Sequence, residues 1–229
     1  MFNVGAFFHY LTNAYLLQGV LVTIALTVIP MAFGLPIALI LALARQSRVT
    51  VLSVLARFYV WIFRGTPLLV QLVIVFTALP QFGIRFGVWT SSILSLTLNE
   101  AAYLSEMVRA GFAGVPQGQR EAAKALGLSP WQTLRLVTLP QAMRIMLPPL
   151  GNSVNGLLKA TSLTSVISME ELMRRAQILM QVKFQVLELL AVAAIWYLTL
   201  TTLWELVQTR LERRFGRGEL TSSGASDRR

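Results

Sequence analysis

Residues 121–127 read Glu-Ala-Ala-Lys-Ala-Leu-Gly, and residues 137–140 read Val-Thr-Leu-Pro. This polar segment, broken by Gly127, lies between two strongly apolar parts of the chain. A polar segment of this length attached to apolar helices predicts a contact with a partner in the aqueous phase. The alternative is that the segment only covers one end of a helical bundle.

The residues around this segment predict a short helix with defined ends. Arg120 to Leu126 is rich in good helix formers, and Gly127 stands where a C′ residue ends a helix. Upstream, Val115 to Gln119 contains a proline and a glycine, which predict a break in the preceding helix. Downstream, Ser129-Pro130 predicts a new helix, with serine as its cap and proline at its first position. We therefore expect a short helix held crosswise between two longer ones.

The composition indicates a membrane protein. Of 229 residues, 55% are hydrophobic and only 13% are charged, whereas soluble domains carry about 25% charged residues. The chain has no cysteine and a single histidine, His9, which excludes disulfides, thiolate metal sites and most histidine-based metal sites. The net charge of +10 could indicate a nucleic-acid partner, but in a membrane protein it indicates basic cytoplasmic loops, so no nucleic acid is expected.

Five apolar segments are long enough to cross a bilayer, which needs about 20 residues each. Prolines and glycines inside them require neighbouring helices to satisfy the freed backbone groups, so the segments are expected to form one bundle. The fold class predicted is an all-α membrane protein with five transmembrane helices. These are Tyr15–Ala44, Arg57–Leu79, Thr90–Phe112, Ile145–Ile167 and Val186–Thr209.

The basic residues in the connections predict the orientation. Fourteen lie on one side: Arg45, Arg48, Arg57, Arg109, Arg120, Lys124, Arg135, Arg144, Arg210, Arg213, Arg214, Arg217, Arg228 and Arg229. Four lie on the other: Arg85, Arg174, Arg175 and Lys183. The excess places the 121–127 segment and the C-terminus in the cytoplasm, and five spans then place the N-terminus outside. Met169–Gln185 is amphipathic and predicts a helix on the external surface, or alternatively a contact for a soluble partner.

Several motifs, in order along the chain, resemble one family. Residues 121–140 resemble the cytoplasmic loop by which the permeases of bacterial ABC importers contact their ATPases. The pattern is Glu-Ala-Ala, three residues, Gly127, nine residues, an aliphatic residue, one residue and Leu139-Pro140. Gln18-Gly19, residues 63–71 (Phe-Arg-Gly-Thr-Pro-Leu-Leu-Val-Gln), residues 102–106 (Ala-Tyr-Leu-Ser-Glu) with Arg109, and Lys159 with residues 161–163 are similar to the same proteins. The resemblance covers Gln18 to Gln177. It is to the polar amino acid branch (histidine, glutamine, arginine, opine) of type I ABC importer permeases.

The resemblance implies a multi-pass subunit of the bacterial inner membrane, surrounded by lipid. Its implied partners are two ATPase subunits, a second permease that is identical or paralogous, and a periplasmic solute-binding protein. ATP and Mg would be bound by the ATPases, since the chain contains no Gly-x-x-x-x-Gly-Lys-Ser/Thr phosphate loop. Residues 1–217 would form the permease domain, with a coupling loop at about 113–144, and residues 218–229 a polar disordered tail.

The resemblance also implies roles for individual residues. Contact with the ATPase would fall on the coupling segment, namely Glu121, Ala122, Ala123, Gly127 and Leu128. Trp61 and Ala160 depart from the family, in which carboxylates are common at these two positions. Both changes remove negative charge near the implied path, so the charge of the transported amino acid does not follow from the resemblance.

Polar residues within the spans are candidates for a translocation path, because ionisable groups in a membrane are costly unless they face water or a partner. They are Lys159, Thr161, Ser162, Glu106, Arg64 and Thr66. For Lys159 the alternatives are a salt bridge to Glu100, Glu106 or Glu188, or snorkelling to the interface. Glu106 and Arg109 are three residues apart and are expected to pair, and Arg64 is expected to pack or to anchor a loop.

Three functions follow for comparison. The leading one is a subunit of an ATP-driven importer that works by alternating access and does no covalent chemistry. A stand-alone secondary carrier or channel is the second, but no inverted repeat supports it and it leaves the polar loop unexplained. The third is an intramembrane hydrolase, for which only Lys159 and Ser162, three residues apart, offer chemistry.

Overall fold

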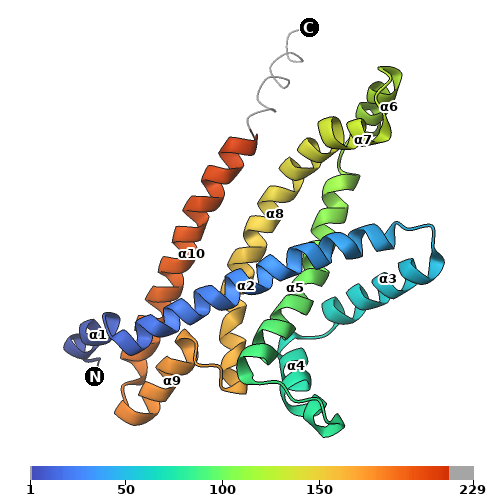
Figure 1. The fold of residues 1–229 in the computed structure, drawn as a ribbon. Helices are drawn as coiled ribbons and strands as arrows, with labels where there is room; N and C mark the ends of the chain where they lie inside the picture. The colour runs from blue at the N-terminus through green and yellow to red at the C-terminus, as the bar shows by residue number, and fades with distance from the viewer. Residues whose placement is uncertain (1, 217–229) are drawn as a thin grey trace.

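The structure is a computed structural model that describes residues 2–216, and these residues form helices joined by short connections (Figure 1). The elements are α1 (Val4–Leu11), α2 (Ala14–Arg45), α3 (Thr50–Gly65), α4 (Leu68–Val73), η1 (Ile74–Ala78), η2 (Leu79–Phe82), α5 (Val88–Ala113), α6 (Gln117–Ala125), α7 (Pro130–Gln132), η3 (Thr133–Thr138), α8 (Leu139–Ala160), η4 (Thr161–Ile167), α9 (Leu172–Lys183) and α10 (Val186–Gly216).

Helix α2 coincides within one residue at each end with the first predicted span. It has 32 residues and contains Pro30 and Pro36, and at 1.5 Å per residue it is about 48 Å long. This exceeds the roughly 30 Å of the hydrocarbon core, so a membrane-spanning α2 would have to tilt or extend beyond that core. It runs across α5 and α8 at an angle (Figure 1). Leu26 packs with Leu96 of α5 and Leu157 of α8, which joins the three helices in one core.

The second predicted span, Arg57–Leu79, is wrong as a single helix. Helix α3 ends at Gly65, a new helical stretch begins at Leu68, and the two are bent by 104°. The cause is Pro67, which lacks an N–H and disfavours the helical conformation in the residue before it. Thr66 accordingly has an extended backbone, with φ −115° and ψ 143°.

By length and hydropathy, α2 and α10 qualify as membrane spans, and the bent pair α3 and α4–η2 could make a third. Helix α5, with 26 residues, and α8, with 22, are also long enough. Their polar residues lower their mean hydropathy. In α5, for example, Ser91, Ser92, Ser95 and Glu100 are buried. The count of five spans and the orientation of the termini therefore stay predictions.

The remaining elements refine the predicted boundaries. The fourth segment begins earlier, at Leu139, and its last part, Thr161–Ile167, is a 3-10 helix. The amphipathic segment is indeed helical as α9, and its Ala176 packs on Leu16 of α2 and Leu189 of α10. Helix α10 continues to Gly216, past the predicted end at Thr209, and the predicted tail, residues 218–229, lies outside the described residues.

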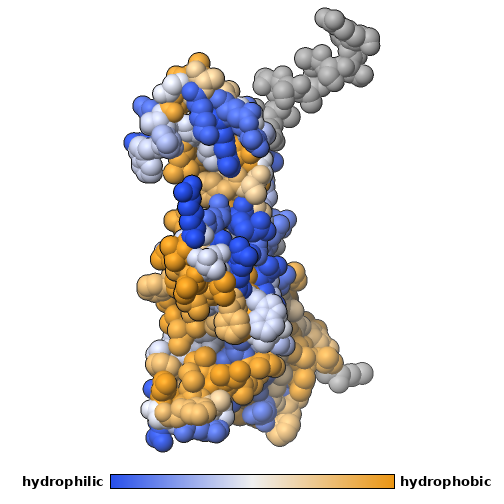
Figure 2. All heavy atoms as spheres, turned by 90° about the vertical axis from the view of Figure 1, so that its right-hand side faces the viewer, coloured by the Kyte–Doolittle hydropathy of each residue, from blue (hydrophilic) through white to orange (hydrophobic). Residues whose placement is uncertain are grey.

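Hydrophobic side chains cover much of the surface seen from the side of α3 (Figure 2). Hydrophilic residues gather at the end formed by α6 and α7 and in a band across the middle of this face. These two hydrophilic regions contain the residues considered next.

Candidate functional site

The loop between α5 and α8 contains the predicted short helix. Helix α6 spans Gln117–Ala125 and so begins three residues earlier than expected, directly after Pro116. Leu126 caps its C-terminal end, and the next residue, Gly127, has a φ of +76°. The N–H of Leu128 donates to the Ala123 carbonyl at 3.1 Å, and that of Gly127 donates to the Lys124 carbonyl at 2.9 Å. These two bonds are the Schellman pattern, and they confirm Gly127 as the C′ residue.

Helix α6 is attached to the rest of the protein by few contacts. Ala123 is its only buried residue, whereas Glu121 and Ala122 are exposed. Arg120 Nη2 donates to the Phe112 carbonyl of α5 at 2.5 Å. The next helix begins with the predicted cap, since Ser129 and Gln132 form a capping box. The helix thus presents a polar, solvent-exposed face beyond the ends of α5 and α8 (Figure 1).

Beneath this loop lies a cavity of about 820 Å³ between the end of α2 and η3. Leu43 of α2, Phe112 of α5 and Leu134 of η3 supply apolar walls, and Arg120 and Lys124 of α6 supply positive charge. Leu128, a predicted coupling residue, is half-buried and lines the same cavity. The loop is therefore separated from α2 by space, which leaves α6 attached mainly through α5 and η3.

The second polar region is centred on Glu106 of α5. Its carboxylate accepts a hydrogen bond from Arg45 Nη1 at 2.6 Å, lies 3.2 Å from Arg64 Nη1, and accepts from Arg109 Nε at 2.8 Å. The Arg64 guanidinium also lies 5.4 Å from the centre of the Tyr103 ring. The predicted pair of Glu106 with Arg109 is present. Arg64 contacts Glu106 and Tyr103, but its side chain is 43% exposed, so its role stays a prediction.

The Glu106 cluster opens into a cavity of about 420 Å³ that Arg57 and Trp61 also line. Arg45, Arg57 and Arg64 face one carboxylate there, so the cavity carries excess positive charge. Arg45 was missed from sequence as a partner of Glu106, because the two residues are 61 positions apart and lie on different helices.

An amide network holds the bend between α3 and α4. Gln71 Nε2 donates to the carbonyls of Phe63 and Thr66 and to the Thr66 hydroxyl, at 2.9–3.1 Å. Asn99 of α5 donates to the Phe63 carbonyl and to Gln71 Oε1, both at 3.1 Å. Gln71 of α4 and Asn99 of α5 thus together satisfy the carbonyl groups that the bend leaves free. Thr66, a predicted path residue, is exposed at this bend.

The third group of predicted residues lies where α8 becomes a 3-10 helix. Lys159 is exposed and forms no salt bridge within residues 2–216, so the alternative of an ion pair with Glu100, Glu106 or Glu188 is not seen there. Glu100 instead accepts from Ser153, and Glu188 accepts from the backbone N–H of Asn3. Thr161 is fully buried and donates to the Leu158 carbonyl, and Ser162 donates to the Lys159 carbonyl, both at 2.7 Å.

Helix α9 is fixed to α2 at the opposite end of the molecule from α6. The fully buried Glu171 caps α9 by accepting from the N–H groups of Met173 and Arg174 at 2.8 Å, and it accepts from the Tyr197 hydroxyl at the same distance. Burial raises the pKa of the Glu171 carboxyl, and these three hydrogen bonds oppose the shift.

These features define a class: a helical protein of the membrane that carries a polar helix on one end and a charged cavity on one side. Residues 34–217 match the family described as the binding-protein-dependent transport system inner membrane component, and the chain belongs to this family. It is therefore an inner-membrane transport subunit and not an enzyme, which confirms the resemblance inferred from its motifs. Membership of a multi-component transport family therefore supports neither the intramembrane hydrolase nor the stand-alone carrier.

Relatives agree along nearly the full chain. The L-cystine transport system permease protein TcyB of Bacillus subtilis is 42% identical over 200 residues, which cover 87% of this chain and 86% of the relative. The glutamine transport system permease protein GlnP of Escherichia coli is 37% identical over 201 residues, which cover 87% and 92%.

Solved structures share the fold. The crystal structure of an amino acid ABC transporter with histidines has a TM-score of 0.83 at 34% identity, and the match covers 87% of this chain and 94% of that chain. The inward-facing MetNI methionine ABC transporter matches with a TM-score of 0.69 at 24% identity, covering 87% and 95%, and it supports the fold alone.

Proposed function

We propose that this chain is the membrane-spanning subunit of an ATP-driven importer that moves polar amino acids from the periplasm to the cytoplasm. The substrate class rests on the sequence motifs and on relatives named for L-cystine and glutamine transport. The proposed assembly contains two ATPase subunits, a second permease and a periplasmic solute-binding protein. ATP and Mg would be bound by the ATPases.

The proposal rests mainly on α6, which is polar and almost entirely exposed. A nine-residue polar helix with a single buried residue stands beyond the helices on either side of it. Such a helix gains little from the packing of its own chain, so a second protein with a complementary groove gives it a reason to be ordered. Glu121 and Ala122 offer one charged and one small side chain on its exposed surface.

The connections of α6 suit the transmission of movement. Only Gly114, Val115 and Pro116 separate it from α5, and η3 continues into α8 without a break. A displacement of α6 by the ATPases would be passed to both helices as rigid elements. Two permeases would then rock between outward-open and inward-open states, which is a two-state change biased by ATP.

The proposed path for the amino acid passes the exposed residues Arg64, Thr66 and Lys159. The cavity beside Glu106 adds Arg45 and Arg57, and its excess of arginines suits a substrate carboxylate. Ser162, which is half-buried, follows Lys159 in the chain, and the buried Thr161 would support the backbone there.

The test is isolation of the tagged chain from native membranes in mild detergent, followed by mass spectrometry and by ATP-driven uptake in proteoliposomes. We expect an ATPase subunit in comparable amount. Glu121→Lys should reduce ATPase recovery and uptake at least tenfold while the chain stays in the membrane, and the isosteric Glu121→Gln should retain most of both. Recovery of the folded chain alone, or normal uptake by Glu121→Lys, would contradict the proposal.

A further inference from the structure

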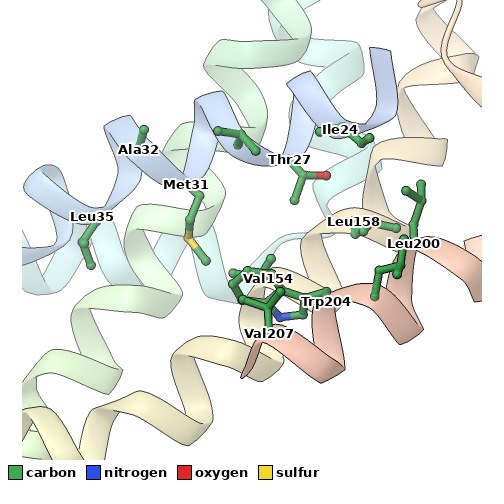
Figure 3. Close-up of a pocket in the computed structure, with 12 residues that line it drawn as sticks. Ile24, Thr27, Met31, Ala32, Leu35, Val154, Leu158, Leu200, Trp204 and Val207 are labelled. Carbon is green, nitrogen blue, oxygen red and sulfur yellow. The ribbon is translucent and has the colours of Figure 1, made fainter. Parts of the chain in front are cut away.

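An apolar groove lies between α2, α8 and α10 (Figure 3). It encloses about 540 Å³ and is lined by Ile24, Thr27, Val28, Met31, Ala32, Leu35, Val154, Leu158, Leu200, Leu203, Trp204 and Val207. A smaller cavity of about 170 Å³ shares Met31, Leu35, Val154 and Trp204 with it and extends to Leu147 and Leu211. The two form one channel along α10.

The polar atoms of the groove already have partners. The Thr27 hydroxyl donates to the Thr23 carbonyl at 2.9 Å, and Trp204 Nε1 donates to the Gly151 carbonyl at 2.8 Å. The remaining wall is hydrocarbon apart from Gln208 at the narrow end, whose amide donates to Glu212 at 2.8 Å. The groove therefore suits an occupant without hydrogen-bonding groups.

The length of the groove matches one leaflet of a membrane. It follows α10 from Leu200 to Leu211, which at 1.5 Å per residue is about 16 Å. Half of the hydrocarbon core of a bilayer is about 15 Å. Two of its walls, α2 and α10, are also the helices that qualify as membrane spans on their own.

Arginines lie beyond the smaller cavity, on the same sides of α8 and α10 as the residues that line it. On α8 the lining residues Leu147, Gly151 and Val154 are preceded at the same spacing by Arg144; on α10 Val207 and Leu211 are followed by Arg214. Arg210 and Arg213 lie in the same turn of α10, and the acidic residue there, Glu212, is bonded to Gln208. Three arginines of α10 and Arg144 of α8 thus outweigh one carboxylate.

We propose that this groove binds one acyl chain of an anionic phospholipid, whose headgroup phosphate is held by Arg144 and Arg214. A hydrocarbon channel one leaflet long with basic residues at one end is complementary to such a lipid. The lipid fills the space between α2 and α10 and so ties these two helices together.

The experiment is native mass spectrometry of the complete transporter, released from vesicles of equal parts phosphatidylglycerol and phosphatidylcholine. We expect one phosphatidylglycerol retained per copy of this chain. The double variant Arg144→Ala/Arg214→Ala should retain several-fold less, and Arg48→Ala, which removes an exposed arginine that lines neither cavity, should match the wild type. Val207→Trp should displace the lipid, whereas Leu206→Trp, which introduces the same side chain at the neighbouring residue outside the lining, should not.

Equal retention of the two lipids, or retention unchanged by both Val207→Trp and the arginine pair, would overturn the proposal. The arginine variants carry the test if Val207→Trp fails to assemble. Because the chain has no cysteine, Val207→Cys offers a second measurement. A disulfide between two copies at this position would show that the groove is a protein interface, and it would also overturn the proposal.

Discussion

Substitutions of Gly127 and Gly118 test whether the positive φ of Gly127 matters for the proposed ATPase contact. Both have open space where a Cβ would be, but only Gly127 has a positive φ, +76°. Gly127→Ala is expected to cost about 1–2 kcal/mol locally and to change the exit of α6. Gly118→Ala lies inside α6 and is expected to stabilise it by about 0.5–1 kcal/mol.

The measurement is ATP-driven uptake per ATP hydrolysed in proteoliposomes. We expect Gly127→Ala to lower this ratio several-fold and Gly118→Ala to leave it unchanged. Equal ratios for the two variants would show that the exit angle of α6 does not matter for coupling.

Glu106 is the only acidic partner of three arginines among the described residues. Glu106→Gln keeps the side-chain size but leaves Arg45, which is 18% exposed, without a counter-charge. Hydrogen bonds to charged groups contribute about 1.5–3 kcal/mol, so we expect a loss of on the order of 2 kcal/mol, or about 4–8 °C in Tm. Thermal unfolding of the purified complex checks this.

The control for Glu106 is Glu205→Gln on α10, an exposed glutamate that forms no salt bridge within residues 2–216. Its Tm should stay within about 1 °C of the wild type. A shift of equal size in both variants would mean that the arginine cluster contributes nothing specific to stability.

Residues whose role depends on near neighbours in sequence could be predicted. Gly127 as a C′ residue, Ser129 as a cap and the pair of Glu106 with Arg109 all follow from spacings of four residues or fewer. Arg45 could not be found in this way. Neither could the failure of Lys159 to pair, because both depend on how separate helices pack.

At the scale of elements, the packing of α9 on α2 depends on Gly19. A Cβ at this position would lie 2.9 Å from Leu172 Cα and 3.1 Å from Leu172 N. The Leu172 N–H also donates to the Thr23 hydroxyl at 3.3 Å. Gly19→Ala must therefore move the start of α9, and we expect a loss of about 1–3 kcal/mol, the usual cost of overpacking.

Gly34→Ala is the matched control in the same helix, because its nearest neighbours would be 3.6 Å away, which is ordinary contact. It should be neutral or slightly stabilising. Thermal unfolding and hydrogen exchange of α9 amides distinguish the two variants. Unchanged exchange in Gly19→Ala would mean that α9 does not rest on this contact.

The elements show where sequence reasoning fails. The bounds of α2 follow from one uninterrupted apolar run, although two prolines lie inside it. The same kind of run across Pro67 contains a bend of 104° instead. At this bend Gln71 and Asn99 satisfy the carbonyl groups that the break leaves free. Because Asn99 comes from α5, the bend depends on tertiary structure that composition does not reveal.

At the scale of the whole molecule, the bent pair α3 and α4–η2 either crosses the membrane or returns as a re-entrant loop to the side from which it came. If it crosses, three spans separate the turn between α2 and α3 from α9. Those two sites then lie on opposite sides of the membrane. The excess of lysine and arginine in the connections predicts that α9 lies outside and the turn inside.

The absence of cysteine allows a direct measurement. Val182→Cys on α9 and Val49→Cys in the turn replace side chains that are 63% and 59% exposed. In right-side-out vesicles a membrane-impermeant maleimide should label Val182→Cys and not Val49→Cys, and in inside-out vesicles the reverse. Labelling of both from one side would make the bent pair a re-entrant loop. Opposite sides with the pattern exchanged would keep the crossing but invert the orientation, and the exposed face of α6 would then point away from any cytoplasmic ATPase.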